Sequence, residues 1–240
     1  MDFGKNAGDA FSYAKAGVFE QKGKWLKLIL ATIFLGIPLT GWFMRVYRGA
    51  TPAPDVDSWG TLSLDGLKLM IIGIIYVIPI IVISLVPAVF LPNVNAGTAA
   101  SSVAGTTIGL IFLSLLVVFI LEIIVAILYP IASIRFARMG KFVEGFNFRA
   151  IIETIGKIGW FNYIIALILL MIVIGIPVFI LEMIFLFAGL AMGHMFIALG
   201  LFVVVVVFIA PVLGTFQARY LTQVYDSREM QEAVPEFPQQ

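Results

Sequence analysis

Long stretches without charged residues dominate the pattern of apolar and polar positions in this 240-residue chain. Residues 69–91 contain no charged side chain, and residues 107–134 contain only Glu122. Residues 158–218 contain only Glu182 and His194. A helix needs about 20 apolar residues to cross a hydrocarbon core of about 30 Å, so the third stretch is long enough for two crossings. The pattern predicts four full transmembrane helices, at about 69–91, 107–134, 160–187 and 195–218.

The connections between these helices differ in positive charge. Residues 92–106 and a predicted turn of small residues at 188–195 hold no Lys or Arg. The other polar stretches hold ten of the fifteen basic side chains: 45–68, 135–157 and 219–240. Because basic loops stay on the cytoplasmic side of a membrane, we expect a cytoplasmic C-terminus in the cell membrane, ending in a flexible acidic tail at 226–240.

A shorter apolar segment at 28–44 is interrupted by Gly36, Pro38 and Gly41. It either forms a re-entrant hairpin that turns at residues 36–38 or crosses once as a short, kinked helix. A hairpin keeps all fifteen basic residues inside, with a cytoplasmic N-terminus, whereas a crossing moves five lysines outside. The predicted fold is an all-α integral membrane protein with four full transmembrane helices and an N-terminal re-entrant or short fifth membrane segment at about 25–47, all in one polytopic domain, 1–225.

Three segments show the apolar spacing of amphipathic helices, and each precedes a membrane segment. They are residues 3–18, 59–67 and 148–158. A short amphipathic helix can lie in the interface plane, so we expect cytoplasmic amphipathic helices. Residues 59–67 can equally be the first turns of the helix that follows them.

Composition narrows the class of function. Hydrophobic residues make up 61% of the chain and charged residues 12%, with a net charge of +1, which argues for a membrane protein and against nucleic-acid binding. The chain has one His and no Cys, and it lacks a recognisable nucleophile–base pair or glycine-rich phosphate loop. We therefore expect no enzyme activity, no catalytic residue, no metal site and no cofactor.

Glu122 is the most informative polar residue, because it lies near the middle of a predicted span. A carboxylate there costs about 2.5–3.5 kcal/mol on insertion scales. Helical spacing places Tyr129 on the same stripe, and Tyr76 and Ser84 on one face of the preceding span, so we expect these two faces to meet. Glu122 is then either a proton, cation or head-group site, or a protonated donor that joins helices.

Two further sets of residues are candidates for lipid and helix contacts. The arginines that follow membrane segments either anchor the helix ends or bind anionic head groups: Arg45, Arg48, Arg135, Arg138 and Arg219. A row of small residues in the last span permits close helix packing, within the chain or with a second copy: Ala210, Gly214 and Ala218.

Several short motifs resemble a known family. They are Gly23-Lys24-Trp25-Leu26-Lys27, Ile37-Pro38 with Gly41-Trp42, Arg45-Val46 with Arg48, Asp57-Ser58-Trp59-Gly60 with Asp65-Gly66-Leu67-Lys68, and Ala218-Arg219-Tyr220-Leu221. This arrangement, over residues 5–225, resembles the mainly archaeal membrane-protein family known as domain of unknown function 4013. The resemblance implies a membrane architecture and brings no catalytic residues with it.

Two functions follow from these patterns. The first is a non-enzymatic protein that organises the membrane or supports a larger complex, with membrane lipids and another copy or another membrane protein as partners. The second is a small transporter or lipid translocase that uses Glu122. An open, polar cavity reaching Glu122 would favour the second.

Overall fold

The computed structural model describes residues 1–90 and 100–232, and these residues form helices and connecting turns without a strand. In chain order the elements are α1 (Phe3–Ala14), the π-helical η1 (Lys15–Phe19), α2 (Lys22–Ile33), α3 (Ile37–Tyr47), α4 (Trp59–Phe90), α5 (Ala100–Met139), the 3-10 turn η3 (Phe142–Phe146), α6 (Phe148–Ile158), α7 (Trp160–Leu170), the π-helical η4 (Met171–Gly175), α8 (Ile176–Met192) and α9 (Met195–Glu232). The all-α prediction is confirmed.

Four helical stretches in the described part are long and apolar enough to cross a membrane. They are Trp59–Pro87, Ile108–Met139, Trp160–Met192 and Met195–Arg228. These stretches confirm the prediction of four helices able to span a membrane. Their ends lie beyond the predicted limits because the helices continue through polar residues: residues 59–67 form the first turns of α4, and α9 runs into the predicted tail. Residues 91–99 and 233–240 lie outside the described residues. They include the first half of the predicted 92–106 connection and the end of the predicted tail.

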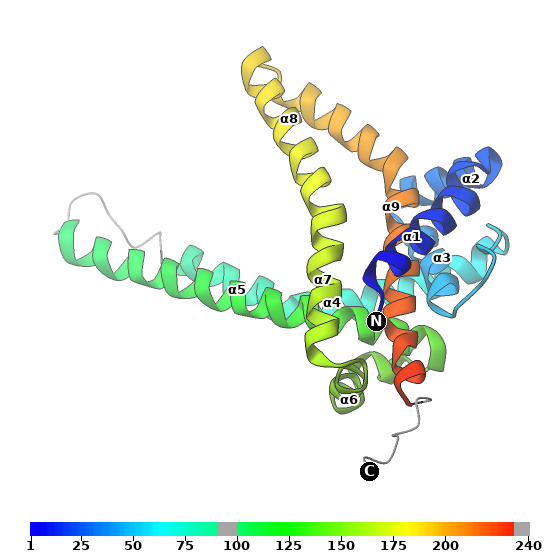
Figure 1. The fold of residues 1–240 in the computed structure, drawn as a ribbon. Coiled ribbons are helices and arrows are strands. Elements are labelled where there is room, and N and C mark those ends of the chain that lie inside the picture. Colours follow the sequence, from blue (N-terminus) through cyan, green and yellow to red (C-terminus); the bar gives the residue numbers. More distant parts are fainter. Residues whose placement is uncertain (91–99, 233–240) are drawn as a thin grey trace, which may run out of the picture.

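The four long stretches form two hairpins that leave a common base in different directions (Figure 1). One hairpin is α4 with α5, and the other is the continuous α7–η4–α8 with α9. The largest cluster of buried residues lies where these helices meet near the base, and it includes Ile72, Ile131, Ile155, Tyr163 and Tyr225. The outer parts of the hairpins diverge and expose their apolar side chains.

Prolines and a glycine shape the second hairpin. The π-helical turn η4 precedes Pro177 at the start of α8, and Pro211 lies inside α9, whose ribbon changes direction midway (Figure 1). A proline lacks the N–H that continues the helical hydrogen bonds, so bends of this kind are expected there. Gly193, with a φ of 67°, ends α8 in the left-handed conformation. The turn predicted at 188–195 is thus confined to residues 193 and 194.

The N-terminal apolar segment reverses direction between two short helices. The turn between α2 and α3 contains Leu35 and Gly36, whose φ angles are 56° and 68°, and Pro38 lies in the first turn of α3. The turn therefore comes slightly earlier than the predicted 36–38. Both helices are too short to cross a bilayer alone.

The predicted amphipathic segment at 3–18 forms α1 and η1, and the one at 148–158 forms α6. In α1 the small residues Ala10 and Ala14 are buried, and α1 packs against α9. In α6 the buried apolar residues are Ile151, Ile155 and Ile158. The apolar faces of both helices therefore contribute to the protein core at the base.

Helices α3 and α4 cross closely at two glycines. A Cβ atom added at Gly41 would lie 1.8 Å from the carbonyl oxygen of Leu62, and one added at Gly66 would lie 1.8 Å from that of Ile37. No side chain fits at such distances. The two glycines therefore set how closely α3 and α4 approach, and this approach places the polar groups that follow α3.

Candidate functional site: the polar junction at the base

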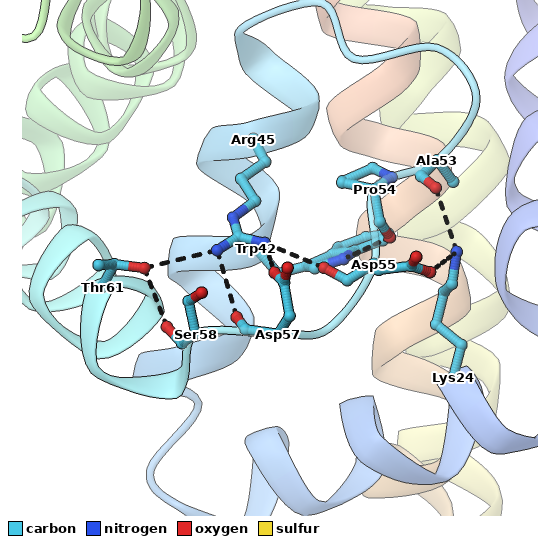
Figure 2. Close-up of polar contacts among 9 residues, drawn as sticks. All are labelled: Lys24, Trp42, Arg45, Ala53, Pro54, Asp55, Asp57, Ser58 and Thr61. Carbon is cyan, nitrogen blue, oxygen red and sulfur yellow. Dashed lines mark hydrogen bonds and ion pairs between the residues drawn. The ribbon is translucent and has the colours of Figure 1, made fainter.

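The loop between α3 and α4 is held by side chains of α2 and α3 (Figure 2). The indole Nε1 of Trp42 donates a hydrogen bond of 3.2 Å to the carbonyl oxygen of Pro54. Lys24 Nζ donates to the carbonyl oxygen of Ala53 at 3.1 Å and lies 3.1 Å from Asp55 Oδ1. The Lys24 side chain is only 8% exposed. A buried ammonium group needs such partners, and these contacts fix the start of α2 against the loop.

Arg45 joins the same loop to the start of α4 (Figure 2). Its guanidinium group forms an ion pair with the Asp57 carboxylate and donates to the carbonyl oxygens of Asp55, at 3.0 Å, and Asp57, at 3.2 Å. Thr61 Oγ1 donates to the carbonyl oxygen of Ser58 at 2.9 Å and so completes the first turn of α4. The hydrogen bond from Arg45 lowers the pKa of the Asp57 carboxyl below its usual value.

Two further arginines connect the helices of the base. Arg48, after the end of α3, pairs with Asp65 of α4 at 2.8 Å, and its Nε donates to the carbonyl oxygen of Ala137 in α5 at 3.0 Å. Arg138 of α5 binds both carboxylate oxygens of Asp226 in α9, at 2.8 and 2.9 Å. The two side chains thereby tie α3, α4, α5 and α9 to one another.

Arg135 organises the connection between α5 and α6. Its Nη2 lies 2.5 Å from Glu144 Oε2, and its Nη1 lies 3.4 Å from Thr154 Oγ1. Asn147, the N-cap of α6, donates to Glu144 through its side-chain nitrogen and accepts a hydrogen bond from the backbone N–H of Ala150. The hydrogen bond from Arg135 lowers the pKa of the Glu144 carboxyl.

The five predicted head-group arginines therefore have partners inside the protein. Four of them pair with carboxylates, as described above. The guanidinium carbon of Arg219 lies 4.8 Å from the centre of the Tyr13 ring, within the range of a cation–π contact. The Tyr13 hydroxyl donates to the carbonyl oxygen of Ala50 at 2.7 Å, and burial raises the pKa of Tyr13 to about 12.

The predicted polar site around Glu122 is brought together only in part. The rings of Tyr76 and Tyr129 meet edge to face with 5.7 Å between their centres, and the Tyr76 hydroxyl donates to the carbonyl oxygen of Gly145 at 2.8 Å. Ser84 donates within its own helix to Ile80. Glu122 is exposed on the outer part of α5 and has no hydrogen bond or ion pair with a described residue.

The row of small residues in α9 faces α3 at its centre. A Cβ atom at Gly214 would lie 2.2 Å from Cζ of Phe43, so the ring occupies the space that the glycine leaves. Ala218 is buried in the cluster that includes Trp42 and Val46, whereas Ala210 is half-buried. The helix next to Gly214 and Ala218 belongs to this chain.

Sequence reasoning missed two parts of the junction. The first is the glycine pair of the α3–α4 crossing, and the second is the set of carboxylates that pair with the arginines. A signal for the second was present, because Asp57 and Asp65 lie in the same polar stretch as the arginines at 45 and 48. The motifs quoted for the family resemblance contain Gly41, Gly66 and both aspartates.

The junction holds helices together. The ion pairs are mutual contacts of oppositely charged side chains at helix ends. Within the described residues no group of three or more His, Cys, Asp or Glu side chains lies close enough to hold a metal ion. The contacts of the junction couple the N-terminal helices to the two hairpins.

Comparison with known proteins identifies a family for most of the chain. A family model described as "Protein of unknown function (DUF4013)" matches residues 26–188, which include α3 to α7 and the loop that carries Asp57. No curated protein and no solved structure matches the chain. The family match covers more than half of the 240 residues. The chain therefore belongs to the family described as Protein of unknown function (DUF4013).

Proposed function

We propose that this protein is a non-enzymatic membrane protein that supports a larger complex by presenting its two hairpins to a partner in the membrane. The observation that carries this proposal is the low burial of the four spans: their most apolar windows are 17, 6, 6 and 11% buried within the chain. A protein that moves a solute alone needs helices that enclose a path. Here the hairpins diverge and offer open faces (Figure 1).

The outer face of α5 is suited to contact another helix. Phe112, Leu116, Phe119 and Ile123 follow one another at helical spacing, and all four are exposed. Helices associate in a bilayer through side-chain packing and not through the hydrophobic effect, because lipid tails are as apolar as the side chains. This exposed row of aromatic and aliphatic side chains supports contact with a second copy of the chain or with another membrane protein.

We also infer that the segment at 25–47 enters and leaves a prokaryotic cell membrane on the cytoplasmic side. Its support is the bond from Lys24, at the start of α2, to the carbonyl oxygen of Ala53, in the loop after α3, at 3.1 Å. A crossing would separate the two ends by about 30 Å. Phe34 and Leu35, at the tip, are 66 and 81% exposed, which suits an apolar tip in lipid. The base, with both termini, then lies in the cytoplasm.

The transporter alternative has less support. Glu122 is exposed, and it lines none of five cavities of 190–540 Å³ that lie between the described helices. None of these five cavities, which are lined by described residues, supplies a polar path to Glu122.

Site-specific photocrosslinking tests the proposal. The photoreactive residue p-benzoylphenylalanine is introduced at Phe119, in the exposed row of α5, and as a control at Phe161, which is also exposed but lies at the start of α7. Irradiation of intact cells should give a discrete protein adduct at Phe119 and none at Phe161. Two results together would overturn the proposal in favour of transport. The first is that Phe119 gives lipid adducts alone. The second is that liposomes containing the purified protein take up solute and that Glu122→Gln abolishes this uptake.

A further inference from the structure

Three basic side chains from three helices line one cavity of about 370 Å³ at the base. They are Arg135 of α5, Lys157 of α6 and Arg228 of α9. Glu153 is the single acidic residue among the lining residues. The cavity therefore gathers positive charge from parts of the chain that are far apart in sequence.

The cavity lies at the level where the spans end. Arg135 is near the end of the span Ile108–Met139, and Arg228 is the last residue of the span Met195–Arg228. Lys157 comes shortly before Trp160, where the third span begins. These three span ends lie on the same side of the protein, because the spans alternate in direction. We place this level at the phosphate layer, because Arg135 and Lys157 flank the predicted membrane segments that end at about 134 and begin at about 160.

Local contacts hold two of the cations at the edge of the cavity. The guanidinium carbon of Arg228 lies 3.8 Å from the centre of the Tyr225 ring. Lys157 Nζ lies 3.7 Å from Glu153 Oε1, one turn earlier in α6, and about half of the lysine side chain is exposed. An ion pair of this kind on a helix surface contributes little, and the Lys157 side chain lines the cavity.

Arg135 contributes both charge and an unused donor. One edge of its guanidinium group pairs with Glu144 at 2.5 Å, and Nη1 lies 3.4 Å from Thr154, which also lines the cavity. Its Nε is buried and has no hydrogen-bond acceptor. Among the described side chains that line the cavity, three are basic and one is acidic.

From this convergence we infer that the cavity binds the phosphate of an anionic membrane lipid. Arginine presents several N–H donors that match phosphate oxygens, and lysine adds a point charge. Basic pockets between membrane helices on the cytoplasmic side are suited to such head groups. The inference does not rest on the proposed function, and it differs from the predicted ring of arginines because Lys157 and Arg228 were outside that set.

Lipid binding to purified full-length protein in detergent tests the inference. Native mass spectrometry compares phosphatidylglycerol with zwitterionic phosphatidylcholine for the wild type, Lys157→Gln, Arg228→Gln and the double variant. The control is Arg149→Gln, which removes a charge from an exposed position of α6 outside the cavity. Arg135 is left unchanged because its pairing with Glu144 supports the fold.

Each cavity variant should weaken phosphatidylglycerol binding about five-fold, which corresponds to about 1 kcal/mol per removed charge. Arg149→Gln should change it less than two-fold, and Arg228→Lys should retain most of it. Equal losses in Arg149→Gln and the cavity variants, or no loss in the double variant while its melting temperature is unchanged, would overturn the inference. Inorganic phosphate that stabilises the protein with the same residue dependence, while phosphatidylglycerol does not bind, would assign the site to free phosphate and overturn the lipid assignment.

Discussion

Arg45 illustrates how single residues determine the base of this protein. Its position after an apolar segment predicts that it anchors the helix end. This prediction depends only on the positive charge of the residue. In the structure the same guanidinium group joins three points of the α3–α4 loop through Asp57 and two carbonyl oxygens. Several hydrogen bonds from one planar group give more geometric specificity than an isolated surface ion pair.

The pairing of Asp57 predicts a specific dependence on pH. Because the folded-state pKa of Asp57 is lowered by Arg45, its contribution to stability is present above the ordinary aspartate pKa of about 3.9 and is lost as the pH falls through the lower folded-state value. Asp57→Asn should therefore melt at a lower temperature than the wild type near pH 7, and the difference should shrink below about pH 4.

Thermal melts in detergent between pH 3 and pH 7 measure this difference. Asp9→Asn is the control, since Asp9 is exposed on α1 and is not among the partners of Arg45, and it should keep the pH profile of the wild type. A difference between Asp57→Asn and the wild type that stays constant over the whole range would contradict the pairing.

Glu122 allows a second prediction at this scale. The carboxyl has no partner among the described residues, so Glu122→Gln should leave the melting temperature of the purified protein unchanged. Glu122→Leu should then also be tolerated in detergent, unlike a residue that joins helices within the chain. A clear loss of stability in Glu122→Leu but not in Glu122→Gln would show that a neutral carboxyl joins helices.

At the scale of elements, the α3–α4 crossing depends on two glycines that approach each other's backbone. Gly41→Ala and Gly66→Ala each place a Cβ atom 1.8 Å from a carbonyl oxygen, so the helices must move apart. Such overpacking typically costs about 1–3 kcal/mol or more. We expect both variants to lose several degrees in melting temperature or to fail to accumulate. Gly60→Ala, in the first turn of α4 with open space around it, should melt like the wild type.

The α3–α9 contact makes a related but milder prediction. Gly214→Leu would collide with the Phe43 ring, which is a side chain and can move, so the loss should be smaller than at Gly41. It should still exceed the losses in Val212→Phe and Leu213→Phe. Thermal melts of the three variants measure the order. Equal values would mean that α9 does not need close approach at Gly214.

The elements also show why sequence reasoning succeeded in part. Four crossings were predictable because the length of a charge-free run reflects the thickness of the hydrocarbon core directly. The spans are apolar on every side, so their sequences carry no stripe that would reveal which helices pair or where the hairpins diverge. Likewise, the proximity of Gly41 to Gly66, and of Arg138 to Asp226, depends on tertiary packing between segments that are far apart in the chain.

At the scale of the whole molecule, the base and the outer hairpins differ in kind. The base contains buried apolar side chains and ion pairs, whereas the outer halves of the spans are mostly exposed within the chain. In the topology that we propose from the positive-inside rule, the base lies in the cytoplasm. Both outer hairpin ends then lie on the other side of the membrane, and the α2–α3 tip remains within it.

Single-cysteine labelling checks this arrangement, because the chain has no cysteine of its own. Cysteines replace Ser12 of α1, Ser58 before α4, Ser102 and Met192 at the outer ends of the hairpins, and Lys141 in the base. A membrane-impermeant maleimide added to intact cells should react at positions 102 and 192 alone. After lysis, positions 12, 58 and 141 should react as well, since all three are exposed in the structure. Ser227 is unsuitable because it is buried.

The N-terminal position decides between the two readings of the 25–47 segment. If this segment enters and leaves on the cytoplasmic side, Ser12→Cys stays unlabelled until lysis, as Ser58→Cys does. Labelling of Ser12→Cys from outside would mean that the segment crosses completely and that five lysines have been translocated. Such a crossing would also require the bond between Lys24 and the loop at Ala53 to be broken, because its two groups would lie on opposite sides of the membrane. The labelling at residue 12 therefore tests the hairpin and the buried lysine contact together, while the four long spans keep their orientation in either case.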